Sequence, residues 1–168
     1  QRLLRLINNI IDIEKFDNHK LKLDLENINI VNLIEDIISS INPYAKSKNL
    51  RIIFDTNDED IVMALDCAKI ERVLLNLLSN AIKFSYVDGI IYVNVNKKEE
   101  NVIISIRDFG IGMSEKYLDK IFDRFIQVDN TMTRKNEGSG IGLSIVKSFV
   151  SLHNGSISVK SKENDGSE

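Results

Sequence analysis

The chain has 168 residues, of which 43% are hydrophobic and 28% charged, as is typical of a folded soluble domain and not of a disordered chain. Its 22 lysines and arginines against 25 aspartates and glutamates give a net charge of -3, so we expect no nucleic-acid partner. The single cysteine, Cys67, cannot form an internal disulfide, and no signal peptide or membrane-spanning apolar run is present. These features predict a cytoplasmic location.

Apolar residues recur at helical spacing at the start of the chain. Leu3, Leu6, Ile10 and Ile13 form one seam of a helix that runs to about Asp17. Roughly two heptads are too short to be stable alone, so this helix either covers the core or is half of a dimeric helical bundle. We favour the bundle, because the next segment reads as the start of a separate domain. The chain starts directly in this pattern without methionine, so we expect a fragment of a longer protein, whose membrane anchoring stays open.

Strand and helix patterns alternate in the next part of the chain. Residues 21–25 alternate apolar and charged side chains as a half-buried strand does, and residues 31–47 return to a helical pattern. Pro43 falls inside this pattern and leaves a kink or a late start open. Two further strands are predicted over 50–56 and 61–65, and the acidic turn between them indicates a hairpin.

The remaining elements complete a mixed pattern of helices and strands. We expect a helix over 66–84, strands over 90–96 and 102–107, a loop-rich stretch over 108–137, a helix over 140–153 and a strand over 156–160. This alternation predicts an α+β fold, a two-layer sandwich in which helices cover one face of a mixed sheet.

The helix predicted over 66–84 has a polar stripe formed by Arg72, Asn76, Asn80 and Lys83. Asparagine is a poor helix former, and two of them one turn apart cost stability unless their amides find partners. An amide oxygen is a hard ligand that suits Mg²⁺, and a lysine one turn further can meet a phosphate. A solvated polar face is the alternative, and this helix alone would favour it.

Two glycine-rich segments follow strands or loops in the second half of the chain. In residues 107–113, two glycines let the backbone turn sharply, and Asp108 can accept a hydrogen bond from an exocyclic amine, although an ordinary Asp-Gly turn is the alternative. Residues 138–143 open a helix whose free N–H groups suit a phosphate, against the alternative of a flexible loop. Neither is a dinucleotide-binding fingerprint or a P-loop. For His153 the sequence predicts only a capping role at a helix C-terminus.

These signals occur in a fixed order that is specific in combination. The order is Asn76-xxx-Asn80-Ala-x-x-Lys83-Phe84, then Asp108-x-Gly110-x-Gly112, then Ile121-Phe122-Asp123-Arg124-Phe125, then Gly138-x-Gly140-x-Gly142-Leu143. Together they resemble the N, G1, F and G2 boxes of sensor histidine kinases of two-component systems. The motifs cover about residues 69–143, and the layout covers the whole chain.

The resemblance implies the Bergerat-type ATP-binding fold, shared with type II topoisomerases, mismatch-repair proteins and a heat-shock chaperone. Residues 1–20 would be part of the dimerisation and phosphotransfer bundle, and residues 21–168 the catalytic ATP-binding domain, which the family continues into a last strand. Asn80 would ligate Mg²⁺ between the phosphates of ATP, with Asn76 and Lys83 nearby, and Asp108 would accept from the adenine amino group.

The resemblance also implies the rest of the ATP site. Those residues are Phe84, Gly110, Ile111, Gly112, Ile121, Arg124, Gly138, Gly140, Ile141, Gly142 and Leu143. Residues 129–137 would be a mobile lid. Ile126 and Gln127 replace the Tyr-Arg of many members, so contact with the γ-phosphate would fall to Arg124 or Arg134.

Asn76 occupies the position at which ATP-hydrolysing members of the superfamily carry a water-activating glutamate, so the resemblance implies phosphoryl transfer and not hydrolysis. The phosphoacceptor histidine would lie upstream, so this chain would bind ATP without phosphorylating itself.

The resemblance implies two protein partners, a response regulator receiver domain and, through the complete bundle, a second copy of the protein. A membrane would be reached only by a segment outside the chain. A serine-directed kinase of the anti-sigma-factor type and a nucleotide-gated binding module without transfer activity are the alternatives. The signal, the cognate regulator and the oligomeric state stay open.

Overall fold

The structure is a computed structural model that describes residues 21–127 and 139–168. Its elements, in chain order, are β1 (Glu26–Asn29), α2 (Ile30–Ser47), β2 (Arg51–Thr56), β3 (Val62–Leu65), α3 (Cys67–Phe84), β4 (Ile90–Lys98), β5 (Asn101–Arg107), the 3-10 helix η1 (Glu115–Tyr117) and α4 (Gly142–Leu152). The helix predicted within residues 1–20 and the lid predicted over 129–137 lie outside the described residues.

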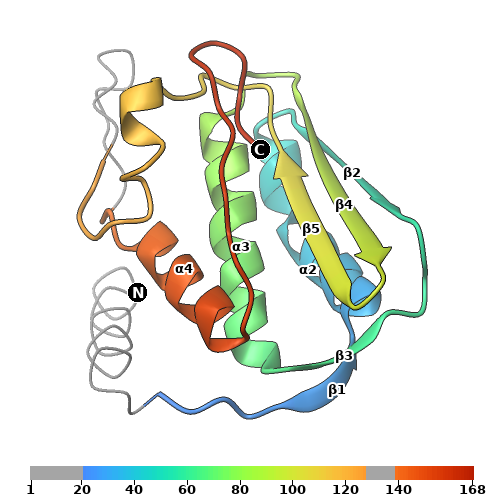
Figure 1. Ribbon diagram of the computed structural model, residues 1–168. Coiled ribbons are helices and arrows are strands. Elements are labelled where there is room, and N and C mark those ends of the chain that lie inside the picture. The colour runs from blue at the N-terminus through green and yellow to red at the C-terminus, as the bar shows by residue number, and fades with distance from the viewer. Residues whose placement is uncertain (1–20, 128–138) are drawn as a thin grey trace.

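A three-stranded mixed sheet forms one layer of the domain, in the order β2-β4-β5. Strand β2 runs parallel to β4, and β4 runs antiparallel to β5. Helices α2 and α3 lie on the same side of this sheet (Figure 1). In the register, Phe54 opposes Val93 and Val93 opposes Ile106, and all three side chains belong to the core beneath the helices. The predicted α+β sandwich with a mixed sheet is confirmed.

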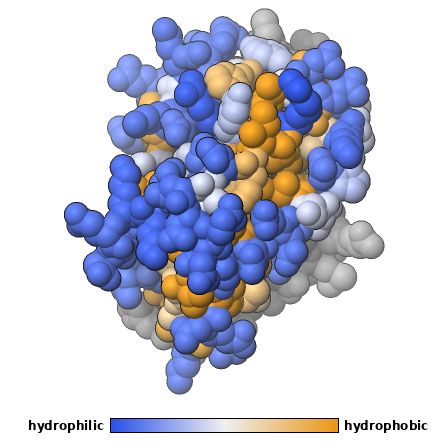
Figure 2. Space-filling view, turned by 90° about the vertical axis from the view of Figure 1, so that its right-hand side faces the viewer, coloured by the Kyte–Doolittle hydropathy of each residue, from blue (hydrophilic) through white to orange (hydrophobic). Residues whose placement is uncertain are grey.

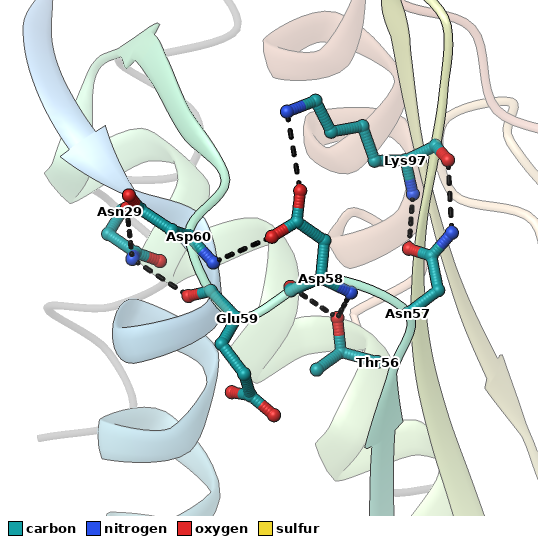
Figure 3. Close-up of polar contacts among 7 residues, drawn as sticks. All are labelled: Asn29, Thr56, Asn57, Asp58, Glu59, Asp60 and Lys97. Carbon is teal, nitrogen blue, oxygen red and sulfur yellow. Dashed lines mark hydrogen bonds and ion pairs between the residues drawn. The ribbon is translucent and has the colours of Figure 1, made fainter.

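The hairpin predicted between residues 50–56 and 61–65 is wrong. Strand β2 pairs with β4, whereas β3 pairs with β1 in a separate two-stranded sheet. The acidic connection is held at two different places (Figure 3). The Asn57 amide exchanges two hydrogen bonds with the Lys97 backbone, of 2.8 and 3.1 Å, while the Asn29 amide donates to the Glu59 carbonyl at 3.0 Å. The connection therefore carries the chain from the sheet to the start of α2.

Two other predicted strands are absent from the described residues. Residues 21–25 are not part of a ladder, because strand β1 begins at Glu26 and pairs from there with β3. Residues 156–160 are not a strand either, and within 21–127 and 139–168 their backbone pairs only at Lys160, which exchanges two hydrogen bonds with Glu168. This segment passes in front of α3 in Figure 1.

Capping residues set where the helices begin. Asn29 accepts hydrogen bonds from the first turn of α2, and Asp66 accepts one from the Lys69 N–H in the first turn of α3. Helix α2 continues through Pro43, which is exposed, as is Ser39 four residues earlier. Water can therefore satisfy the carbonyl that loses its N–H partner there, and neither a kink nor a late start is needed.

The side of the molecule that lies to the right in Figure 1 is shown in Figure 2. Hydrophilic side chains cover most of it, and a band of apolar side chains crosses it. Strand β2 is the last strand of its sheet, and its outward-facing Ile53 is 39% exposed. No helix within residues 21–127 and 139–168 is long and apolar enough to cross a membrane.

Candidate nucleotide-binding site

Helix α3 carries the polar stripe predicted from the sequence, and its two asparagines are held differently. The Asn76 amide nitrogen donates to the Arg72 carbonyl at 2.7 Å, one turn back in the same helix. Its oxygen faces the start of α4, where a Cβ added to Gly142 would lie 3.0 Å from it. The Asn80 side chain, which is partly buried, makes no hydrogen bond with any residue in 21–127 or 139–168. Asn80 is therefore the amide that is available to a ligand.

Asp108 follows β5 and is buried, with 7% of its surface exposed. Its carboxylate accepts the Gly110 N–H at 2.9 Å, and its backbone exchanges two hydrogen bonds with Ser167, of 2.9 and 3.2 Å. Burial raises the pKa of Asp108 above its usual range, although hydrogen bonds from the Gly110 and Ser167 backbones partly oppose this rise. A buried carboxylate held on one side by a backbone N–H presents a fixed acceptor on the other.

The loop after Asp108 packs directly on the C-terminal end of α3. The Ile111 N–H donates to the Phe84 carbonyl at 3.1 Å, and a Cβ added to Gly110 would lie 2.0 Å from the same oxygen. The glycine is therefore required by this close approach. Because the two segments are fixed to each other, the acceptor of Asp108 and the polar stripe of α3 keep a constant spacing. The Lys83 ammonium lies 4.7 Å from the centre of the Phe84 ring at the same end of the helix.

The start of α4 is built from a glycine turn. Gly140 has a positive φ of 68°, and its carbonyl accepts the Phe125 N–H at 2.8 Å. Phe125, also at a positive φ, is 68% exposed. The Ser139 hydroxyl accepts the Ile141 N–H at 3.3 Å. The first turn of α4 then presents free backbone N–H groups next to Asn76, and such a helix start attracts anions.

One continuous cavity of about 2490 Å³ brings most of the predicted site residues together. Its lining includes Asn76, Asn80, Lys83, Phe84, Asp108, Ile111, Gly112, Ile121, Gly140, Gly142 and Leu143. The cavity also runs along β5 and residues 156–160, so its volume alone does not define a ligand. The chemistry of its lining is more specific. The amide of Asn80, Lys83 and the start of α4 line the same cavity as the buried carboxylate of Asp108.

Three predicted site residues do not line the cavity, and a fourth is not described. Gly110 is buried beneath the cavity against Phe84, and Ile141 is 2% exposed in the cluster between α3 and α4, so both shape the site without lining it. Arg124 is exposed and does not line the cavity. Gly138 lies outside the described residues.

Sequence reasoning missed several residues that line the cavity. Met113 and Phe122 add apolar surface, and Ser139 adds a hydroxyl beside Gly140. Each lies next to or within a motif that was recognised. Their proximity to those motifs was the available signal, since neither a methionine nor a serine in a loop indicates a ligand by itself.

The residues present fit a Mg²⁺-nucleotide. Among the described residues, no group of three or more His, Cys, Asp or Glu side chains could hold a metal ion. Mg²⁺ is commonly bound through one or two protein ligands and the phosphates of a substrate, which matches the amide oxygen that Asn80 offers. The free N–H groups of α4 suit those phosphates, and Asp108 suits an exocyclic amine.

Comparisons with known proteins place the chain in a family. Residues 66–168 match the family described as histidine kinase-, DNA gyrase B-, and HSP90-like ATPase. The sensor histidine kinase WalK of Bacillus subtilis (strain 168) is 38% identical over 99% of this chain, which spans 27% of that protein. The sensor protein kinase WalK of Staphylococcus aureus is 36% identical over 99% of the chain, which spans 40% of it. The chain thus represents less than half of these relatives.

Solved structures share the fold. The nucleotide-free catalytic domain of histidine kinase ThkA is 27% identical, with a TM-score of 0.76 over 86% of this chain and 91% of its own. Full-length ShkA in complex with AMPPNP has a TM-score of 0.86 over 99% of this chain and 34% of its own, at 23% identity, a likeness of fold. The chain therefore belongs to the histidine kinase-, DNA gyrase B- and HSP90-like ATPase family, and the relatives that it matches over nearly its full length are sensor histidine kinases.

Proposed function

We propose that this chain binds Mg²⁺-ATP and transfers its γ-phosphate to a histidine located upstream of residue 1, from which the phosphate passes to an aspartate on a response regulator. The observation that carries the proposal is the convergence, on one cavity, of the unpartnered Asn80 amide, the buried Asp108 carboxylate and the start of α4. Each matches one part of ATP: the metal-bound phosphates, the adenine amino group and the phosphate oxygens.

The proposal assigns a role to each of these residues. Asn80 would hold Mg²⁺, which when bound supplies charge neutralisation between the phosphates. Lys83 would add a positive charge at the same end of α3. Asp108 would accept from the adenine amino group, which favours adenine over guanine because guanine presents a carbonyl oxygen at that position. The N–H groups of Gly142 and Leu143 would donate to the phosphates.

Asn76 supports transfer to a protein over hydrolysis. Its amide donates to the Arg72 carbonyl, and the amide cannot remove a proton from water as a carboxylate can. Water in the site would then be poorly activated, so the γ-phosphate would persist until an acceptor side chain arrives. The response regulator as final acceptor is supported by a related structure, histidine kinase ThkA in complex with response regulator protein TrrA.

The Mg²⁺ and ATP assignment can be tested by the Asn80→Ala substitution. We expect Mg²⁺-dependent ATP binding, measured by isothermal titration calorimetry with and without Mg²⁺, to be abolished because the amide ligand is gone. The matched control is Asn32→Ala, which removes an exposed asparagine from α2 and should leave binding unchanged. Equal Mg²⁺-dependent affinity in both variants would disprove the site assignment.

The transfer reaction can be tested with ATP labelled at the γ-phosphate. We expect acid-labile, base-stable label on a protein extended upstream of residue 1, and none on the present chain alone. Rapid release of free phosphate by the present chain would instead identify an ATPase and contradict the role given to Asn76.

A further inference from the structure

His153 connects the end of α4 to the start of α3 through both ring nitrogens. Its Nδ1 lies 2.7 Å from the Phe149 carbonyl oxygen, which can only accept, so Nδ1 carries the proton. Its Nε2 accepts the backbone N–H of Asp66 at 3.0 Å. Asp66 is the N-cap of α3 and is 3% exposed. The ring is therefore a neutral imidazole with one donor and one acceptor, and each is used by a different helix.

These two helices carry opposite sides of the nucleotide site. Helix α3 presents Asn76 and Asn80, whereas α4 presents Gly142 and its free N–H groups, on the same cavity. The two helices pack through a cluster of five buried residues: Val73, Ile141, Ile145, Val146 and Phe149. The bond from Asp66 to His153 fixes the end of α4 that is opposite to its phosphate-binding start. A change at this end can tilt the start of the helix relative to Asn80.

Protonation of the ring removes this connection. With a second proton, Nε2 becomes a donor and faces the donating N–H of Asp66, so the hydrogen bond is lost and a buried N–H is left unpaired. Among residues 21–127 and 139–168, the charged groups bonded at this junction are the Asp66 carboxylate and Lys69, and one turn further lies Arg72, whose guanidinium is 5.1 Å from the centre of the Phe149 ring. The segment before β1 contributes the Asp24 N–H, and the last turn of α4 carries no basic residue.

The Asp66 carboxylate is already fully engaged and does not compensate. It accepts the N–H groups of Asp24 and Lys69, at 3.0 and 3.1 Å, and forms an ion pair with the Lys69 ammonium. Burial would raise the pKa of Asp66, but these hydrogen bonds hold it below its ordinary value. An imidazolium would have to compete with Lys69 for this carboxylate, within a junction that already holds two cations.

We infer that His153 is a positioning residue that aligns α4 with α3 only while its ring is neutral, and that nucleotide affinity therefore falls as the ring takes up a second proton. The inference rests on the proposed function, because it assigns a regulation to the same site.

The experiment compares the parent chain with His153→Gln and His153→Ala. Glutamine supplies an acceptor oxygen that does not titrate. The His153→Gln variant should therefore bind ATP as tightly as the parent at about pH 8. At about pH 6 it should bind ATP more tightly than the parent, by roughly 2- to 10-fold. Alanine removes the acceptor at every pH, so its affinity should be weaker than that of the parent at about pH 8. The titration of ATP itself and of His19 is common to all three proteins and cancels.

Two measurements separate the possible failures. The ¹⁵N chemical shifts of the His153 ring report its tautomer without nucleotide, and a proton on Nε2 in the neutral ring would overturn the inference. Equal pH dependence of ATP affinity in the parent and His153→Gln would also overturn it, even if ATP binds well. Loss of ATP binding in the parent itself would refute the proposed function, and the ring shifts would still decide the tautomer. Thermal unfolding at about pH 8 checks that each variant is folded.

Discussion

The two hydrophobic clusters of the domain differ in what surrounds them. The cluster between the sheet and helices α2 and α3 is aliphatic throughout its buried part, with Ile34 and Val95 almost completely enclosed. The cluster between α3 and α4 is smaller and is bordered by polar contacts, among them the cation-π contact of Arg72 with Phe149 and the bond from Asp66 to His153. We therefore expect the first cluster to hold α3 firmly in place. We expect α4, which the second cluster holds, to be the less firmly held of the two helices that line the site.

The strongest test of this difference uses a matched pair of substitutions. Ile34 and Ile145 are both 1% exposed, one in each cluster. Replacing either by alanine should lower the free energy of unfolding by about 2–5 kcal/mol, because a buried side chain is removed and a cavity remains. We expect Ile34→Ala to leave ATP affinity unchanged below its unfolding temperature and Ile145→Ala to reduce it, measured by calorimetry at one temperature.

Amide hydrogen exchange gives the control for this pair. Exchange should accelerate first in α4 for Ile145→Ala and evenly across the core for Ile34→Ala. If both variants bind ATP as the parent does, the second cluster is as firm as the first and the comparison fails.

The same difference explains what could be predicted from the sequence. Local patterns predicted α2, α3, α4, β4 and β5 within two residues at each end, because periodicity and short turns are local signals. The partners of β2 and β3 could not be read in this way. The connection between them bonds to distant residues: the Asn57 side chain donates to the Lys97 carbonyl, forty residues away, and the Glu59 carbonyl accepts the side-chain amide of Asn29. An acidic turn between two strands looks like a hairpin until those distant contacts are known.

The polar residues that line the cavity were easier to predict than the strand pairing, and for a physical reason. Asn76, Asn80 and Asp108 are polar residues that interrupt apolar stretches of the sequence, so they can be recognised from the sequence alone. Ile141 has no such signal. It was expected in the ligand site from its place among the glycines, but its side chain turns into the α3–α4 cluster, since the alternating glycines are the residues that face the cavity. His153 was read as a cap, because its bond to Asp66 spans 87 residues.

A smaller effect is expected at the apolar end of the cavity, from Asp108→Asn. The Gly110 N–H fixes one side-chain oxygen, so the new amide group points its N–H toward the base. The N–H of the new amide then faces the N–H of the adenine amino group, so ATP affinity should fall by at least roughly tenfold. GTP offers a carbonyl oxygen at that position, so its affinity relative to that of ATP should rise. Competition of both nucleotides for a fluorescent analogue measures this; an unchanged preference for ATP would show that Asp108 does not face the base.

The same variant has a pH dependence whose sign follows from the pKa of Asp108. Because burial raises the pKa of this carboxyl in the folded state, the folded protein binds a proton more readily than the unfolded chain does. The resulting stability is fully present below the unfolded pKa and is lost as the pH rises through the folded pKa. The neutral amide escapes this loss, so Asp108→Asn should be most stabilising relative to the parent near neutral pH, with a gain that shrinks on acidification, as thermal unfolding can show.

The smallest expected effect is that of Gly142→Ala at the start of α4. The added methyl group would lie 3.0 Å from the Asn76 oxygen, which the 2.7 Å bond to Arg72 holds in place, so the helix start must move by a few tenths of an ångström. Alanine is the better helix former, by about 0.8–1.0 kcal/mol in a helix interior and by less at a first position, and this gain offsets part of the crowding, so thermal stability should change little. ATP affinity should fall only roughly 2- to 5-fold, because the N–H groups move relative to Asn80.

Gly155→Ala, at the other end of α4, is the matched control, because its added methyl group would lie at the same 3.0 Å from a Val150 methyl group. If the control weakens binding equally, the effect belongs to the whole helix; a difference assigns it to the contact between Asn76 and Gly142, and so to the alignment of the two helices at the phosphates.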